Sequence, residues 1–189
     1  MTREPALRAD ARRNHHLIIT TAAAVFAEDG LDVPMEAIAR RAGVGVGTLY
    51  RRFPDRGELI AAVAAHTFRA VLEDVRAAAA AAPTPWDALT RLLSGSENLR
   101  LTVHLAFLSP HTWTRVHSAS ESREIHDEMM AALETLVNDA RREGSIRADV
   151  GTEEVLGLVS WVLAAPASAA ESVPRWLELV LDGLRAHRY

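Results

Sequence analysis

The chain has 189 residues, of which 49% are hydrophobic and 24% are charged, and its formal net charge is −4. This composition indicates a globular protein of one or two domains and excludes a disordered or fibrous chain. The absence of cysteine excludes disulfides, iron–sulfur clusters and thiol catalysis. The sequence shows neither a secretory signal pattern nor an apolar run of the ~20 residues that a membrane span needs. We therefore expect a cytoplasmic protein without a membrane partner.

Positive charge is concentrated in one short segment. Residues 40–56 carry five arginines and one aspartate, whereas residues 61–189 carry twelve arginines against seventeen acidic residues. An acidic protein with one compact basic segment can bind a polyanion at that segment. The alternative is an arginine face that is simply solvated.

Alanine is abundant, and apolar residues recur at helical spacing, which together predict an all-α fold of about nine helices without strands. Gly30, Gly43 and Gly144 mark expected helix ends, and Asp55 is an expected N-cap. The expected helices cover approximately residues 10–29, 34–42, 46–53, 55–82, 86–93, 97–108, 120–143, 152–166 and 172–187.

Residues 35–56 contain two short helical segments on either side of Gly43, a residue that can adopt the positive φ of a sharp chain reversal. This pattern is typical of a helix-turn-helix, whose second helix projects outward from a small core. In the second segment, Tyr50 and Arg52 can reach phosphates, and Val46 and Thr48 can contact base edges. The residues spaced to form the small core with the first helix are Phe26, Leu31, Ile38, Ala42, Val44, Leu49 and Phe53.

An ordered set of short motifs within residues 18–59 resembles the TetR family of transcriptional regulators. The motifs are Ile38-Ala39, Ala42-Gly43-Val44, Gly47-Thr48-Leu49-Tyr50, Phe53 and Glu58-Leu59. The resemblance implies a homodimeric repressor that binds a palindromic operator and is released by a small-molecule effector. It implies a helix-turn-helix domain over residues 1–55 and a helical effector-binding and dimerisation domain over residues 56–189. The DNA contacts carried over by position are Arg41, Val46, Gly47, Thr48, Tyr50, Arg52 and Arg56.

The chain departs from the family pattern at several positions. Gly45 stands where serine is common, Arg52 where histidine is frequent and Arg56 where lysine is frequent. Both arginines keep a donor for a phosphate group. Val33 and Pro34 lack the hydroxyl that often begins the second helix, so the resemblance gives no phosphate contact there.

The C-terminal part resembles a common effector-domain subgroup of the same family, over residues 123–150 and 181–185. In the family, the last two helices of each subunit form a four-helix dimer interface. The apolar stripes that suit this role contain Val155, Leu158, Val159, Val162, Trp176, Leu177, Val180, Leu181 and Leu184. Candidates for the lining of a ligand pocket are Phe68, Trp86, His104, Phe107, Trp113, His117, Met130 and Leu133. The alternative for both sets is that they form an ordinary subunit core.

The sequence also bears on three alternatives to a DNA-binding regulator: a metal-binding protein, an enzyme and a small-molecule binding protein. His104, His111, His117 and His126 follow no known spacing of metal ligands, so we expect neither a metal nor another cofactor. The sequence has no nucleophile elbow, phosphate loop or HExxH motif, so we expect no enzymatic activity. A small-molecule binding protein that kept the fold but lost operator binding is the remaining alternative.

Overall fold

The computed structural model describes residues 3–108, 114, 116, 118 and 120–186, and over these residues it is almost entirely helical. Nine α-helices and one 3₁₀ segment are found there, and no strand is, which confirms the predicted all-α class. The helices are α1 Arg3–Asp29, α2 Met35–Arg41, α3 Val46–Arg52, α4 Arg56–Ala81, α5 Pro85–Gly95, α6 Glu97–Leu108, α8 Ser120–Arg142, α9 Thr152–Leu163 and α10 Val173–Leu184, with η1 Ala167–Ser172 before α10.

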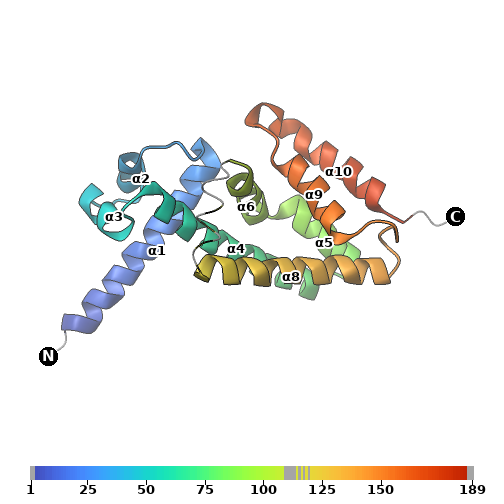
Figure 1. Cartoon of the computed structure of the whole chain (residues 1–189), viewed down its shortest axis with the longest axis horizontal. Coiled ribbons are helices and arrows are strands. Elements are labelled where there is room, and N and C mark those ends of the chain that lie inside the picture. The colour runs from blue at the N-terminus through green and yellow to red at the C-terminus, as the bar shows by residue number, and fades with distance from the viewer. Residues whose placement is uncertain (1–2, 109–113, 115, 117, 119, 187–189) are drawn as a thin grey trace.

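The first three helices gather at one end of the molecule, and α9 and α10 lie at the other (Figure 1). Helix α4 joins the first three helices to the middle of the molecule, because it packs against α1 and against α5, α6 and α8. Helices α9 and α10 pack in turn on α5, α6 and α8. Its buried face includes Leu59, Val63, Phe68 and Val71, none of which exposes any surface. A single apolar core therefore continues from the first three helices into the rest of the chain.

Several helix ends follow the expected local chemistry. Gly30, Gly43 and Gly144 have φ values of +83°, +66° and +80°, a region that side chains with a Cβ rarely adopt. Asp55 caps α4 by accepting a hydrogen bond from the backbone N–H of Glu58 at 3.0 Å. These boundaries were predicted because each depends on one residue type at one position.

Other boundaries differ from the prediction. Helix α1 begins at Arg3 rather than near residue 10, and α5 continues to Gly95. Helix α9 ends at Leu163, and the unpredicted segment η1 fills most of the stretch before α10. Helix α10 ends at Leu184 rather than near residue 187. The backbone carbonyl of Leu184 accepts a hydrogen bond from the backbone N–H of Arg147 at 3.0 Å. This bond lies beside an isolated β-bridge between residues 146 and 185. Helical periodicity carries no signal for such a long-range pairing.

No helix within the described ranges combines the length and the apolar character that crossing a membrane requires.

Candidate nucleic-acid interface

The α2–α3 pair is held at a fixed angle by a small apolar core. Ile38 and Leu49 are fully buried and Phe53 is 3% exposed. At the reversal, the backbone N–H of Val44 donates to the carbonyl of Ala39 at 3.0 Å, and Gly43 supplies the positive φ. Because Leu49 is the buried residue of α3, the rest of this helix is left to face outward.

The outward face of α3 combines apolar, aromatic and basic side chains. Val46 and Tyr50 are 41% and 40% exposed, and Arg51 and Arg52 are also exposed. Neither arginine forms a hydrogen bond or ion pair with the described part of the chain, so both charges remain open to a partner. Gly47 is exposed, Thr48 is half-buried, and a Cβ at Gly47 would meet no atom within 4 Å. This face can therefore approach a nucleic-acid groove closely.

Tyr50 is held by an acidic neighbour on α2. Its hydroxyl donates to Oε1 of Glu36 at 3.1 Å. This hydrogen bond raises the pKa of Tyr50. The pKa of Glu36 is lowered, first by a hydrogen bond from its own backbone N–H and then by the bond from Tyr50. The phenol is thus oriented before any partner arrives, but a carboxylate lies beside the face that would meet phosphates.

Two of the expected DNA contacts are engaged within the chain. Arg41 pairs with Glu28 and with Asp29, the latter at 3.2 Å, both on the last turn of α1. Arg56 donates to the backbone carbonyl of Leu31 and, at 2.7 Å, to that of Val33. Arg56 is half-buried, and its guanidinium ties the start of α4 to the loop before α2.

The base of α3 is joined to α1 by a ring contact. His15 stacks on Phe53 with ring centroids 5.0 Å apart. Partial burial lowers the pKa of His15, and the positive charge of Arg52 lowers it further. The C-terminal end of α3 therefore presents Arg52 next to a histidine that favours its neutral form.

Arg40 and Arg51 are not among the DNA contacts carried over from the family, although the helical spacing predicts an outward position for Arg51. Both are exposed, and neither is paired within the described ranges of the chain. The family motifs do not include these positions, but the excess of positive charge in residues 40–56 already pointed to them.

The expected pocket residues that the structure describes are divided between the core and the lining of one cavity. Phe68 and Leu133 are core residues, and Trp86 is almost buried with the Arg185 guanidinium 5.7 Å from its ring centroid. Met130 is half-buried against the core. His104 lines a cavity of about 480 Å³ that involves α1, α6 and η1. Trp113 and His117, and the side chain of Phe107, lie outside the described residues.

The expected dimer stripes divide into inner and outer members. Leu158 and Trp176 are exposed, and Val162 and Val180 are half-buried. Trp161 and Leu179, which were not expected, are 74% and 53% exposed on the same two helices. The members that are buried within the subunit are Val155, Val159, Leu177, Leu181 and Leu184.

In this helix pair Gly43 forms the turn, and the second helix presents to solvent an oriented tyrosine and two arginines without a partner in the part of the chain that the structure describes. These features define a DNA-binding protein of the helix-turn-helix class. Residues 18–63 match the family described as bacterial regulatory proteins of the tetR family, and residues 103–186 match the C-terminal domain of SbtR-like transcriptional regulators. The chain belongs to the TetR family of transcriptional regulators.

Solved structures agree with this assignment over nearly the whole chain. A TetR transcriptional regulator from Streptomyces coelicolor is 32% identical, with a TM-score of 0.66 over 92% of this chain and 99% of that one. A TetR regulatory protein from Mycobacterium vanbaalenii is 30% identical, with a TM-score of 0.57 over 95% and 99% of the two chains. FadR from Bacillus subtilis, solved in complex with stearoyl-CoA, is 18% identical, with a TM-score of 0.62 over 90% and 99%, and shares the fold.

Sequence similarity to the curated relatives covers a small share of the chain. An HTH-type transcriptional regulator of Staphylococcus aureus is 41% identical over 54 residues. This match spans 28% of the chain and 29% of the length of that relative.

Proposed function

We propose that the chain is a homodimeric transcriptional repressor that binds a palindromic operator through α3 and is released by a small-molecule effector. The observation that carries the proposal is the outward face of α3, where Arg51 and Arg52 are unpaired among the described residues and Tyr50 is already oriented. Arginines of this kind contact phosphates, while Val46 and Thr48 are placed to read base edges. Residues 1–55 then form the DNA-binding domain and residues 56–189 the effector-binding and dimerisation domain.

Dimerisation is proposed through the outer face of α9 and α10. A large exposed apolar patch on a monomer commonly marks an interaction site. Leu158, Trp161, Trp176 and Leu179 are all exposed here, with Val162 and Val180 beside them. A two-fold dimer formed in this way would place two α3 helices on the two half-sites of a palindrome.

Arg41 and Arg56 take a supporting role in this proposal. Their guanidinium groups hold α2 and α4 against the end of α1 and the following loop. They would set the orientation of the reading helix, with α4 as the lever between α3 and the effector region. An effector releases the operator only if it binds better to a dimer whose α3 helices are wrongly spaced.

The test begins with selection of bound DNA from a random pool, using the full chain. We expect a two-fold symmetric site and weaker binding of that site by Arg52→Ala. Arg76→Ala is the matched control, because Arg76 is exposed on α4 and paired with Glu128 at 2.7 Å. Equal binding by wild type and Arg52→Ala would show that the DNA face is assigned wrongly. Failure to select any DNA would favour a small-molecule binding protein with the same fold.

A further inference from the structure

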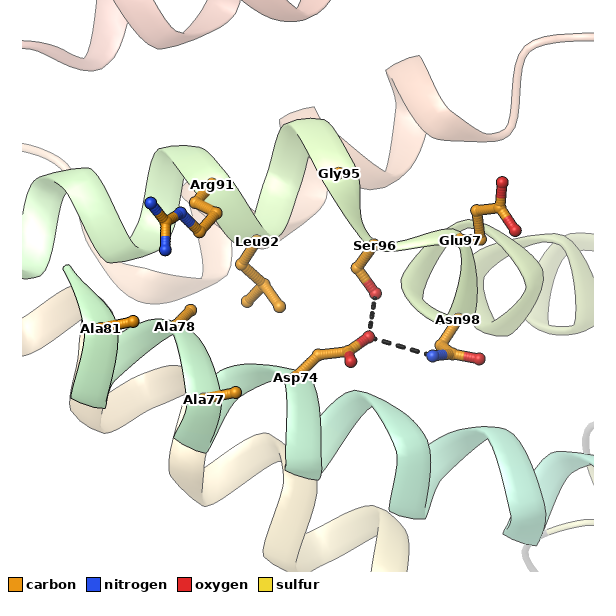
Figure 2. A pocket seen from close by; sticks show the side chains of 10 residues that line it. All are labelled: Asp74, Ala77, Ala78, Ala81, Arg91, Leu92, Gly95, Ser96, Glu97 and Asn98. Carbon is orange, nitrogen blue, oxygen red and sulfur yellow. Dashed lines mark hydrogen bonds between the residues drawn. The ribbon is translucent and has the colours of Figure 1, made fainter.

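A groove runs between the C-terminal half of α4 and α5 and is closed at one end by the start of α6 (Figure 2). Its volume is about 540 Å³. Small-molecule sites commonly occupy roughly 300–1,000 Å³, so the groove is large enough for a metabolite. The lining residues are Asp74, Ala77, Ala78, Ala81, Arg91, Leu92, Gly95, Ser96, Glu97 and Asn98.

Two carboxylates line the α6 end of this groove: Glu97 is exposed, and Asp74 is half-buried and held by hydrogen bonds. The Asp74 carboxylate is the one with fixed geometry. Its Oδ2 accepts hydrogen bonds from Oγ of Ser96 at 2.6 Å and from Nδ2 of Asn98 at 3.0 Å (Figure 2). Its Oδ1 has no partner among the described residues. Both donors are neutral, so they fix the direction of the carboxylate without cancelling its charge. A half-buried carboxylate with one open oxygen is an acceptor for an ammonium group.

The floor beyond Asp74 is apolar and made of small side chains. Ala77, Ala78 and Ala81 follow on the same face of α4, with Leu92 on the opposite wall (Figure 2). The seven residue steps from Asp74 to Ala81 correspond to roughly 10 Å of helix. An alkyl chain of similar length can lie along these alanines without displacing a larger side chain.

A positive charge stands at the other end of the groove. Arg91 is exposed, forms no hydrogen bond or ion pair with the described part of the chain, and lies opposite Ala78 and Ala81 (Figure 2). The groove thus has the acids Asp74 and Glu97 at one end, the base Arg91 at the other and an apolar surface between them.

We propose that this groove binds an aliphatic zwitterion, with its ammonium group on Oδ1 of Asp74, its chain over the alanines and its carboxylate at Arg91. Charge complementarity at both ends selects this occupant over a simple amine or a simple fatty acid. Its role as the effector rests on the function proposed above, whereas binding itself does not.

The same aspartate links the groove to the lever helix. Ser96 caps α6, because its Oγ accepts from the backbone N–H of Leu99 at 3.0 Å while donating to Asp74. Asp74 therefore holds α4 to the junction between α5 and α6. An ammonium group bound to Oδ1 would weaken the hydrogen bonds that Asp74 accepts from Ser96 and Asn98. A ligand could therefore change the position of α4 relative to the junction between α5 and α6.

The experiment is calorimetric titration of the DNA-free full chain with three probes of matched length: aminocaproate, hexylamine and caproate. We expect aminocaproate to bind with a dissociation constant of about 1 mM or below, hexylamine more weakly and caproate least. Caproate binding as well as aminocaproate, or no heat from any probe, would overturn the proposal.

Matched variants assign the two ends. Asp74→Asn keeps the acceptor for Ser96 and Asn98 but removes the charge, so affinity for aminocaproate should fall about tenfold or more. Glu73→Gln, one residue away on α4, removes the same charge outside the groove lining and should bind as wild type does. Arg91→Gln should weaken aminocaproate but leave hexylamine unchanged. Wild-type affinity in Asp74→Asn would overturn the assignment.

A separate operator-binding assay with and without aminocaproate keeps the two proposals distinguishable. Ligand binding in the titration without any operator binding would contradict the proposed function but support the proposed ligand site in the groove. Operator binding by a protein that gives no heat with any probe would contradict only the proposed ligand site in the groove.

Discussion

The outer faces of α3 and of the α9–α10 pair both expose large apolar side chains, but the charges around them differ. On α3, Val46 and Tyr50 stand beside Arg51 and Arg52, and the helix contains no acidic residue. On α9 and α10, Leu158, Trp161, Trp176 and Leu179 share helices with Glu153, Glu154, Glu178 and Asp182. Exposed apolar groups among unpaired cations suit a polyanion, whereas an apolar patch on net acidic helices suits another protein surface. The two patches are similar in exposure, and the charges beside them indicate that they bind different partners.

The largest expected effect comes from placing a charge in the α9–α10 patch. Trp161→Glu should weaken dimerisation about 30-fold or more, since a central aromatic anchor is lost and a carboxylate would have to be buried. Operator affinity should fall as dimerisation weakens, because a palindromic site is bound by the dimer. Sedimentation velocity measures the association, and Ala131→Glu on the exposed face of α8 adds the same charge elsewhere. An unchanged dimer in Trp161→Glu would contradict the interface proposed here.

The second comparison separates two arginines near α3. Arg56→Ala should lower the free energy of unfolding by about 1–3 kcal/mol, because two backbone carbonyls lose a charged donor. Arg52→Ala should change it by less than about 0.5 kcal/mol, since its side chain is exposed and unpaired among the described residues. Urea denaturation followed by circular dichroism gives both values. An equal loss of unfolding free energy in the two variants would contradict the assignment of Arg56 to a structural role and of Arg52 to DNA contact.

A smaller effect is expected at the acid beside Tyr50. Glu36→Gln keeps an acceptor for the Tyr50 hydroxyl but removes a negative charge next to the DNA face. Operator affinity should rise about two- to fivefold at low salt. Fluorescence anisotropy with a labelled operator measures the gain, and Glu134→Gln on α8 is the control. A loss of affinity would show that the carboxylate contributes to binding.

The smallest effect concerns pH. The pKa values of His15 and His66 are lowered, each first by burial, and then by Arg52 and His16 respectively. The unfolded chain therefore binds more protons than the folded one as pH falls below about 6.5, so stability is lost on acidification. We expect Tm to fall by about 1–3 °C between about pH 7.5 and pH 5.5 from these groups. The double variant His15→Gln/His66→Gln should reduce this fall, and an identical pH dependence would contradict the assignment.

Much of the α2–α3 region could be predicted from the sequence because its determinants are local. Gly43 and Asp55 fix a turn and a cap through their own chemistry, and Leu49 and Phe53 recur at helical spacing. The pairing of Arg56 with loop carbonyls, and the groove around Asp74, depend on residues that only the tertiary fold brings together. Helical periodicity also predicted the apolar stripes of α9 and α10. It could not predict which of their residues are buried within the subunit, because that depends on how α10 packs on α9 and α5.

The most direct test of the central claim is the salt dependence of operator binding by wild type and by Arg51→Ala/Arg52→Ala. Each phosphate contact contributes about one unit to the slope of log K against log salt concentration. If both arginines of α3 contact phosphates, the slope should become shallower by about two units in the double variant. A slope identical to that of wild type would show that the exposed arginines of α3 do not meet the DNA backbone.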